Sequence, residues 1–462
     1  MATQAEPAVH VYCGPTITAA EVLGIIPGAS VHPPVRHGDL LRLAAAPGDT
    51  VVIIDGVFHA VAAVRHKEIL DLLAGGVRVL GAASMGALRA AELYPYGMTG
   101  IGDIFAAYRD GITEADDEVA VAHTEDGKQL SEALADIRAL AAEAVTEGVL
   151  DRGEAERIVS HARGTHYLDR TWPALRKAAS TNPEAEALLE RLDDWRVARG
   201  PAETAKHEDA VAALRLVADG KQPMLAADWT NGPWRTFYLR HWIARYRGSV
   251  RDGIHVPYLA VQQHQQIYDP GFPERWRHHV LSWIAGLLGP AGPGARPDHD
   301  GGPDTEARAL ALAGARGLAL RHLSPDQLAY WLTDDELAIL PDTEKLACLL
   351  VRSVSRDPSA GVWPAASGDA PGLINSAIDS VGAVAATFRR NDEIAHSGPG
   401  RTVSKLRHDV LRRHLGDLWG TDPADERALT AAARDRGFYE ITSAVEAVRL
   451  FFLAAAFGPQ SS

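Results

Sequence analysis

The N-terminal part of the chain alternates short apolar runs with segments of helical period, and this alternation restricts the fold more than any other feature. The apolar runs are AVHVYCGPT (8–16), ASVHPPV (29–35), DTVVIIDG (49–56) and VRVLGAAS (77–84). A helical pattern follows each of them; the one at 66–76, HKEILDLLAGG, closes on two glycines. The third run is almost wholly apolar, as expected of a strand covered on both faces. Four βα units in succession predict an α/β domain with a parallel, doubly wound sheet.

From about residue 130 the sequence is mainly helical in period, and we expect no further strands. All ten tryptophans lie at or after Trp172, where they form either the core between helices or a peptide-binding groove. Two stretches rich in Gly, Pro and small polar residues, 289–307 and 355–372, have the composition of linkers. The expected domains are an α/β core at 1–130, a helical domain at 131–288 and a helical C-terminal domain at 308–462.

Composition and charge argue against several classes of function. The chain of 462 residues is 46% apolar and 23% charged, and no apolar run reaches the roughly 20 residues of a membrane-spanning helix. The N-terminus has no secretory pattern, and Cys13 and Cys348 are the only cysteines, so we expect a cytoplasmic protein. A net charge of -14 without a basic cluster argues against nucleic-acid binding. Neither G-x-G-x-x-G after the first strand nor G-x-x-x-x-G-K occurs, so no nucleotide cofactor is expected.

Polar residues follow three of the expected strands. Gly14, Pro15 and Thr16 come after the first strand, Asp55 after the third and Ser84 after the fourth. In an open parallel sheet, ligands bind outside the carboxyl ends of the strands, where helix N-termini point their N–H groups at the crevice. We therefore expect Thr16, Asp55 and Ser84 to face one another across a single crevice.

Ser84 lies in an A-x-S-x-G sequence where a strand turns into a helix. This pattern is close to the G-x-S-x-G elbow that exposes a nucleophilic serine beside backbone N–H donors. The alternative is that Ser84 is only a helix N-cap. His66 and Lys67 open the preceding helix, where a basic residue opposes the macrodipole. The dipole favours the neutral amine of Lys67, which can then serve as a base for the serine.

The run ADDEVAVAH (115–123) places Asp116, Asp117, Glu118 and His123 close together. These are side chains that can bind a metal, but they lack the spacing of a calcium loop. An acidic helix start is also stabilised by the helix dipole without any metal. We therefore expect no metal site and no cofactor.

Several segments resemble the TfuA-like family, in the same order and at close spacing. They are VYCGPT, PPVRHGDLL, VVIIDGVFHAVAAVRHKEIL, GVRVLGAASMGALRAAELYPYGMTGIGDI and DDEVAVAH. The resemblance covers about residues 8–140, and HYLDRTW further on is similar to the family's downstream helices. Beyond about residue 200 nothing resembles the family. The resemblance implies a partner of YcaO-type, ATP-dependent enzymes in peptide backbone thioamidation, with sulfur taken from a ubiquitin-like carrier protein that bears a C-terminal thiocarboxylate.

The resemblance also implies roles for the residues at the strand ends, because releasing sulfide from a thiocarboxylate is an acyl transfer that needs a nucleophile, a base and oxyanion donors. Ser84 is the expected nucleophile, Lys67 or His66 the base, and Asp55 the group that orients the base. The residues expected to bind the carrier tail or other substrate are Gly14, Pro15, Thr16, Arg89, Asp117, Glu118 and His123. Cys13 is either a persulfide carrier or a buried core thiol.

Two classes of function stay open. One is an enzyme that releases sulfur; the other is a non-catalytic adaptor that docks on the YcaO-type enzyme and reshapes its site. An adaptor has no need to gather Ser84, Asp55, Lys67 and Thr16 at strand ends, so their pattern favours the enzyme. A sugar-binding or nucleotide-binding domain is a weaker alternative, because phosphate loops are missing. A precursor peptide is a further possible partner.

Overall fold

The computed structural model divides into two units, residues 1–234 and 235–462, each with its own core. The residues it describes are 7–57, 61–124, 127–200, 203–221, 236–286, 304–355, 373–398 and 400–457. The domain boundaries expected from the sequence stay a prediction. Both expected linkers lie largely outside the described residues.

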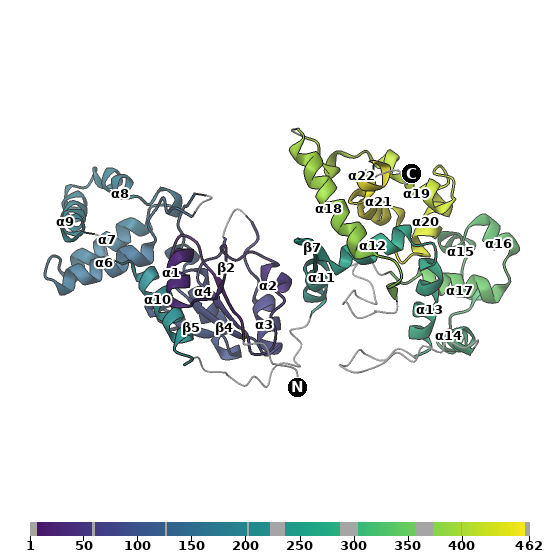
Figure 1. Ribbon diagram of the computed structural model, residues 1–462, viewed down its shortest axis with the longest axis horizontal. Helices are drawn as coiled ribbons and strands as arrows, with labels where there is room; N and C mark the ends of the chain where they lie inside the picture. Colours follow the sequence, from purple (N-terminus) through teal and green to yellow (C-terminus); the bar gives the residue numbers. More distant parts are fainter. Residues whose placement is uncertain are drawn as a thin grey trace. The chain divides into compact units, whose positions relative to one another are not determined.

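The first unit is built on a five-stranded parallel sheet with the order β2-β1-β3-β4-β5, shown in purple and blue in Figure 1. Its strands are β1 (Val9–Tyr12), β2 (Ser30–His32), β3 (Thr50–Ile53), β4 (Arg78–Ala82) and β5 (Thr99–Ile101). The prediction of a parallel, doubly wound sheet is confirmed. The sequence did not indicate β5, which has three residues and a glycine at its centre. The ring of Phe105 packs where Gly100 has no side chain.

Helices cover both faces of this sheet (Figure 1). One face, with Val52, Ile54 and Leu80, packs against α1 (Ala19–Ile25) and α10 (Ala205–Ala218). The opposite face, with Val51 and Ile53, packs against the remaining helices of the α/β part. These are α2 (Asp39–Arg42), α3 (His66–Ala74), α4 (Met85–Leu93) and α5 (Asp103–Arg109). Alternate residues of β3 thus face different helices, as the pleat of a strand covered on both faces requires.

A helical layer joins the sheet to α10. It consists of α6 (Leu134–Thr146), α7 (Arg152–Arg163), α8 (Trp172–Ala179) and α9 (Pro183–Arg199). Trp172 is buried in the core that these helices share, as the interpretation of the tryptophans as helix core predicts. Because α10 follows this layer and returns to cover the sheet, the α/β fold is completed by residues well beyond 130.

The second unit is mainly helical, as expected. Its helices are α11 (Phe237–Tyr246), α12 (Tyr258–Tyr268), α13 (Phe272–Ile284), α14 (Asp304–Ala315), α15 (Pro325–Trp331), α16 (Asp334–Ile339), α17 (Asp342–Arg352), α18 (Ser380–His396), α19 (His408–Trp419), α20 (Glu426–Arg434), α21 (Ile441–Arg449) and α22 (Phe452–Phe457). The expectation of no further strands is wrong at a hairpin formed by β6 (Gly248–Arg251) and β7 (Ile254–Pro257). Asp252 and Gly253 form its turn, both with positive φ, which is the Asp-Gly signature of a tight hairpin.

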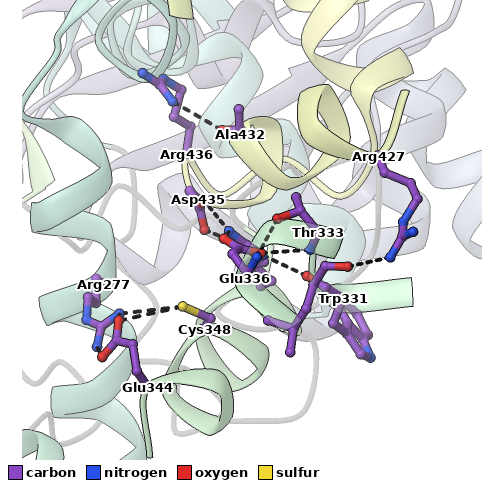
Figure 2. A network of polar contacts seen from close by, with 12 residues as sticks. Arg277, Trp331, Thr333, Glu336, Glu344, Cys348, Arg427, Ala432, Asp435 and Arg436 are labelled. Atoms are coloured by element: carbon purple, nitrogen blue, oxygen red, sulfur yellow. Dashed lines mark hydrogen bonds and ion pairs between the residues drawn. The ribbon is translucent and has the colours of Figure 1, made fainter. Parts of the chain in front are cut away.

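Arg352 at the end of α17 fastens three segments of the second unit together. Its buried guanidinium donates to both carboxylate oxygens of Glu336 at 2.6 Å and to both of Asp435 at 2.8 Å. Figure 2 shows Glu336 next to Asp435, and Cys348 beside Arg277 and Glu344. Two carboxylates around one buried guanidinium satisfy its donors and balance its charge.

Of the helices described, none is long and apolar enough to cross a membrane.

Candidate functional site

Asp55 lies at the point where the strand order reverses between β1 and β3, the usual ligand position in a doubly wound sheet. Its side chain is 2% exposed. Oδ2 accepts hydrogen bonds from the backbone N–H of Gly14 at 2.8 Å and of Thr16 at 3.1 Å, and Oδ1 accepts one from the Thr16 hydroxyl at 2.6 Å. The structure therefore brings two of the three predicted crevice residues into direct contact. The carboxylate of Asp55 thus accepts the hydrogen bonds that the β1–α1 loop could otherwise donate to a ligand.

Ser84 follows a strained residue at the end of β4. The preceding Ala83 has φ of 67°, in the left-handed region that costs a residue with a Cβ roughly 1–2 kcal/mol. Ser84 occupies the N-cap position of α4, but its side chain accepts no capping hydrogen bond. The N-cap alternative is therefore wrong for the hydroxyl, although the residue does start the helix. The side chain is also close to full burial, at 9% exposure.

The small residues around Ser84 are needed for close backbone packing. A Cβ on Gly81 would lie 2.1 Å from the carbonyl oxygen of Gly86, and a Cβ on Gly86 would lie 1.8 Å from that of Ile53. The N–H of Gly86 donates to the Ile54 carbonyl at 3.2 Å. The N–H of Met85, directly after Ser84, has no acceptor among the described residues. In the serine elbow, this is the N–H that contributes to the oxyanion hole.

His66 and Arg89 share one carboxylate. Glu92 on α4 lies 2.8 Å from Nε2 of His66 and 2.5 Å from a guanidinium nitrogen of Arg89. Burial raises the pKa of Glu92, but the hydrogen bonds from His66 and Arg89 outweigh it and hold the pKa below its usual value. Arg89 also donates to the carbonyl of Val64, just before α3. These contacts join the start of α3 to the second half of α4. Lys67 lies half-buried in the first turn of α3, and its role as a base stays a prediction.

Sequence reasoning missed a carboxylate–imidazole pair at the same edge of the sheet. Glu68 in the first turn of α3 is fully buried, and its Oε1 lies 2.6 Å from Nδ1 of His37. Glu68 also accepts hydrogen bonds from the N–H groups of Gly38 at 2.8 Å and Arg65 at 3.0 Å. The signal in the sequence was the glutamate three residues after Arg65, the position of a capping-box acid. His37, the partner of Glu68 in the β2–α2 loop, lies in no sequence pattern that indicates this contact.

A model of the TfuA-like protein family matches residues 55–171. The chain carries a TfuA-like domain. The matched residues begin at Asp55 and include Ser84, Arg89 and the start of α3, whereas the β1–α1 loop precedes them. TfuA-like proteins are associated with YcaO-type enzymes and peptide thioamidation, so the domain links this chain to such systems. A search of curated proteins found no match.

The acidic run of the TfuA-like domain is held by arginines. Asp117 and Glu118 belong to the short 3-10 helix η2 (Asp116–Glu118). The fully buried Arg170 donates to Asp117 at 2.9 Å, and Arg138 donates to Glu118 at 2.8 and 3.1 Å. These bonds anchor η2 to the helical layer. Substrate binding by Asp117 and Glu118 stays a prediction.

His123 and Cys13 occupy different settings. The imidazole of His123, just after η2, lies 2.9 Å from the carbonyl of Thr124; its proposed contact with substrate stays a prediction. Burial raises the pKa of the Cys13 thiol to about 12, with smaller contributions from Asp55 and Glu21. A neutral buried thiol fits the core interpretation better than a persulfide carrier. Within the described ranges, no three His, Cys, Asp or Glu side chains are grouped so as to hold a metal ion.

Proposed function

We propose that this protein supplies sulfide to a YcaO-type enzyme by hydrolysing the C-terminal thiocarboxylate of a ubiquitin-like sulfur-carrier protein. The observation that carries the proposal is the turn at Ser84. A strained alanine precedes the serine, the hydroxyl makes no cap, and the next N–H lacks an acceptor among the described residues. Backbone strain that is retained at a strand end is characteristic of functional turns. These are the parts that acyl transfer requires.

The proposed reaction has two steps. In the first, the Ser84 Oγ attacks the carbonyl carbon of the thiocarboxylate, the C–S bond breaks, and the hydroxyl proton passes to the leaving sulfur, which departs as HS⁻. The Met85 N–H stabilises the oxyanion that forms on the way. In the second, water attacks the resulting ester, which regenerates the serine and leaves the carrier with an ordinary carboxylate. No oxidant or reductant is needed.

The other predicted residues divide between binding and shaping the site. Arg89 lies in the middle of α4, the helix that Ser84 begins, and its side chain is 14% exposed, so it suits the binding of a carrier tail that ends in a negative charge. Both oxygens of Asp55 are engaged by the β1–α1 loop. Asp55 therefore suits a role in holding Gly14, Pro15 and Thr16 in place better than the role of orienting a base.

The test is release of sulfide from a thiocarboxylated carrier, with and without the YcaO-type partner. We expect the native protein to release sulfide and Ser84→Ala to lose several powers of ten in rate, as happens when a covalent nucleophile is removed. Ser160→Ala, an exposed serine on α7, is the matched control and should keep the native rate. A folded Ser84→Ala protein that releases sulfide at the native rate would reject the proposal. A native protein that releases none, yet accelerates thioamidation by its partner, would establish the adaptor function instead.

A further inference from the structure

The hairpin of β6 and β7 has an edge, along β6, that pairs with no other strand among the described residues. We propose that this edge is a docking site for an acidic peptide segment of another protein, which adds to the hairpin as a third strand. The hairpin belongs to the second unit, where β7 lies beside α11 and α12 (Figure 1). The inference goes beyond the proposed sulfide release and does not depend on it.

The hydrogen-bond pattern of the hairpin leaves backbone groups of β6 on the open edge. β6 pairs antiparallel with β7, and in such a ladder every second residue bonds to the neighbouring strand. The carbonyl of Arg247, directly before β6, accepts the N–H of Tyr258 at 2.8 Å. By alternation, Gly248 and Val250 are the residues whose N–H and C=O groups point away from β7. No group in the described part of the chain bonds them there.

The two faces of β6 have different surroundings. Ser249 lies opposite Val256, which is fully buried in the core of the second unit, so this face packs against helices. Val250 points to the other face, and its side chain is 69% exposed. An extended peptide that reaches β6 would therefore place an apolar side chain beside Val250.

The charges around the hairpin favour an acidic occupant. Between residues 236 and 268, Asp252 is the only acid, although the whole chain has a net charge of -14. The same stretch holds four exposed arginines, which are Arg240, Arg245, Arg247 and Arg251. Arg251 lies 4.0 Å from Asp252 and 3.7 Å from Asp379, beyond hydrogen-bond distance of both carboxylates. The arginines are spread over a helix and a hairpin, so the sequence shows no basic run.

These charges argue against a second copy of the chain as the occupant. Two β6 strands that paired antiparallel about Ser249 would place Arg247 of one copy opposite Arg251 of the other, and like charges in that position are destabilising. A peptide with an acid opposite Arg251 and an apolar residue opposite Val250 would instead gain on both faces. Strand addition of this kind takes its affinity from the backbone and its specificity from alternate side chains.

A fluorescein-labelled peptide of alternating glutamate and valine is the probe, and fluorescence anisotropy with the full chain measures its binding. We expect it to bind, with an affinity that falls as salt is added, because salt screens the arginines. A peptide of alternating lysine and valine should not bind. Two further peptides carry N-methyl groups, one at the valines and the other at the glutamates. Only one edge of an added strand faces β6, so one of these peptides should fail and the other should bind.

Val250→Pro removes the outward N–H, which β7 does not use, and should weaken binding by at least about 10-fold. Val250→Thr keeps that N–H and a branched side chain, so it is the matched control and should bind almost as the native protein does. Arg251→Gln should weaken binding and reduce its dependence on salt. Arg407→Gln should change neither, because Arg407 is an exposed arginine that already pairs with Asp409. Melting temperature checks the folding of each variant.

The N-methylated peptides test strand addition on the native protein, so the inference can be rejected even if Val250→Pro does not fold. Equal binding of the two N-methylated peptides would overturn it, as would a native protein that does not bind the glutamate–valine peptide. Native affinity in a folded Val250→Pro protein would do the same. Dimerisation of the native protein that Val250→Pro abolishes would assign the edge to a second copy instead. A single-stranded oligonucleotide that binds where the peptide does not would assign the arginines to nucleic acid.

Discussion

The hydroxyl of Thr16 lies 2.6 Å from Oδ1 of Asp55, so the loop after β1 is fastened to the end of β3 by a buried hydrogen bond. Two backbone N–H groups of the same loop donate to Oδ2. One carboxylate thus satisfies three donors that belong to a segment about 40 positions earlier in the chain. The conformation of the loop therefore depends on a carboxylate from outside the loop.

Asp55→Asn should destabilise the protein. The amide has one acceptor oxygen, and its NH₂ group would face N–H donors, so at least one buried donor would lose its partner. The free energy of unfolding should fall by about 1–3 kcal/mol. Denaturant titration measures this, and Asp110→Asn is the control, because that carboxylate pairs with Arg109 at the surface. Equal unfolding free energies for the native and Asp55→Asn proteins would contradict the account of the loop.

Gly86→Ala should prevent normal folding of the first unit. The added methyl group would lie 1.8 Å from the Ile53 carbonyl oxygen, a backbone atom that cannot move without shifting β3. Gly24→Ala in α1 is the control, because nothing lies within 4 Å of its added Cβ; it should be neutral or stabilise by about 0.5–1 kcal/mol. Circular dichroism and melting temperature distinguish these outcomes. A Gly86→Ala protein with native melting temperature would show that the approach of α4 to β3 is looser than described.

Cys13 should resist alkylation in the folded protein. Burial raises its pKa to about 12, so at pH 8 the thiol is almost wholly neutral, and the thiolate is the form that reacts. Labelling by iodoacetamide should be at least about 100-fold slower than in the denatured protein. Cys348, whose pKa burial raises to about 11, should be slowed less. Rapid labelling of Cys13 in the folded protein would revive the persulfide alternative.

Asp209 should make the first unit less stable as pH rises from about 4 to 6. Its carboxylate on α10 accepts the N–H groups of Asp103 and Ile104 at the start of α5. Burial raises its pKa from 3.8 to about 6, and those hydrogen bonds only partly oppose the shift. The folded state thus binds more protons than the unfolded state in this window, so the stabilising contribution present below pH 4 is lost by pH 6.

The size of this effect is about 1–2 kcal/mol, less than the full shift implies, because solvent screens a partly buried group. Unfolding free energies of the native and Asp209→Asn proteins, compared from pH 4 to pH 7, measure it. The native protein should lose stability relative to the variant across this range. A constant difference between the two proteins would refute the assignment.

The sheet could be predicted because a strand that is buried on both faces has a continuous run of apolar residues, as at Val51 to Ile54. The sequence did not predict that α10 covers the sheet, because no local pattern states which face a distant helix packs against. The contact between Thr16 and Asp55 could be predicted, because both residues follow strands whose carboxyl ends lie at one edge of the sheet. The contact between His37 and Glu68 could not be predicted, because His37 lies in a loop whose path depends on tertiary packing.

At the carboxyl edge of the sheet, carboxylates of the chain itself accept the backbone N–H groups of several loops and helix starts, among them those of Gly38 and Arg65, which bond Glu68. Asp55 fills the β1–α1 loop, and Asp209 fills the start of α5. At the start of α4, the Met85 N–H has no acceptor among the described residues. An incoming anion would therefore meet repulsion from the carboxylates of Asp55, Glu68 and Asp209. Repulsion by these carboxylates would therefore restrict where an acidic ligand can bind, as much as attraction to free N–H groups would.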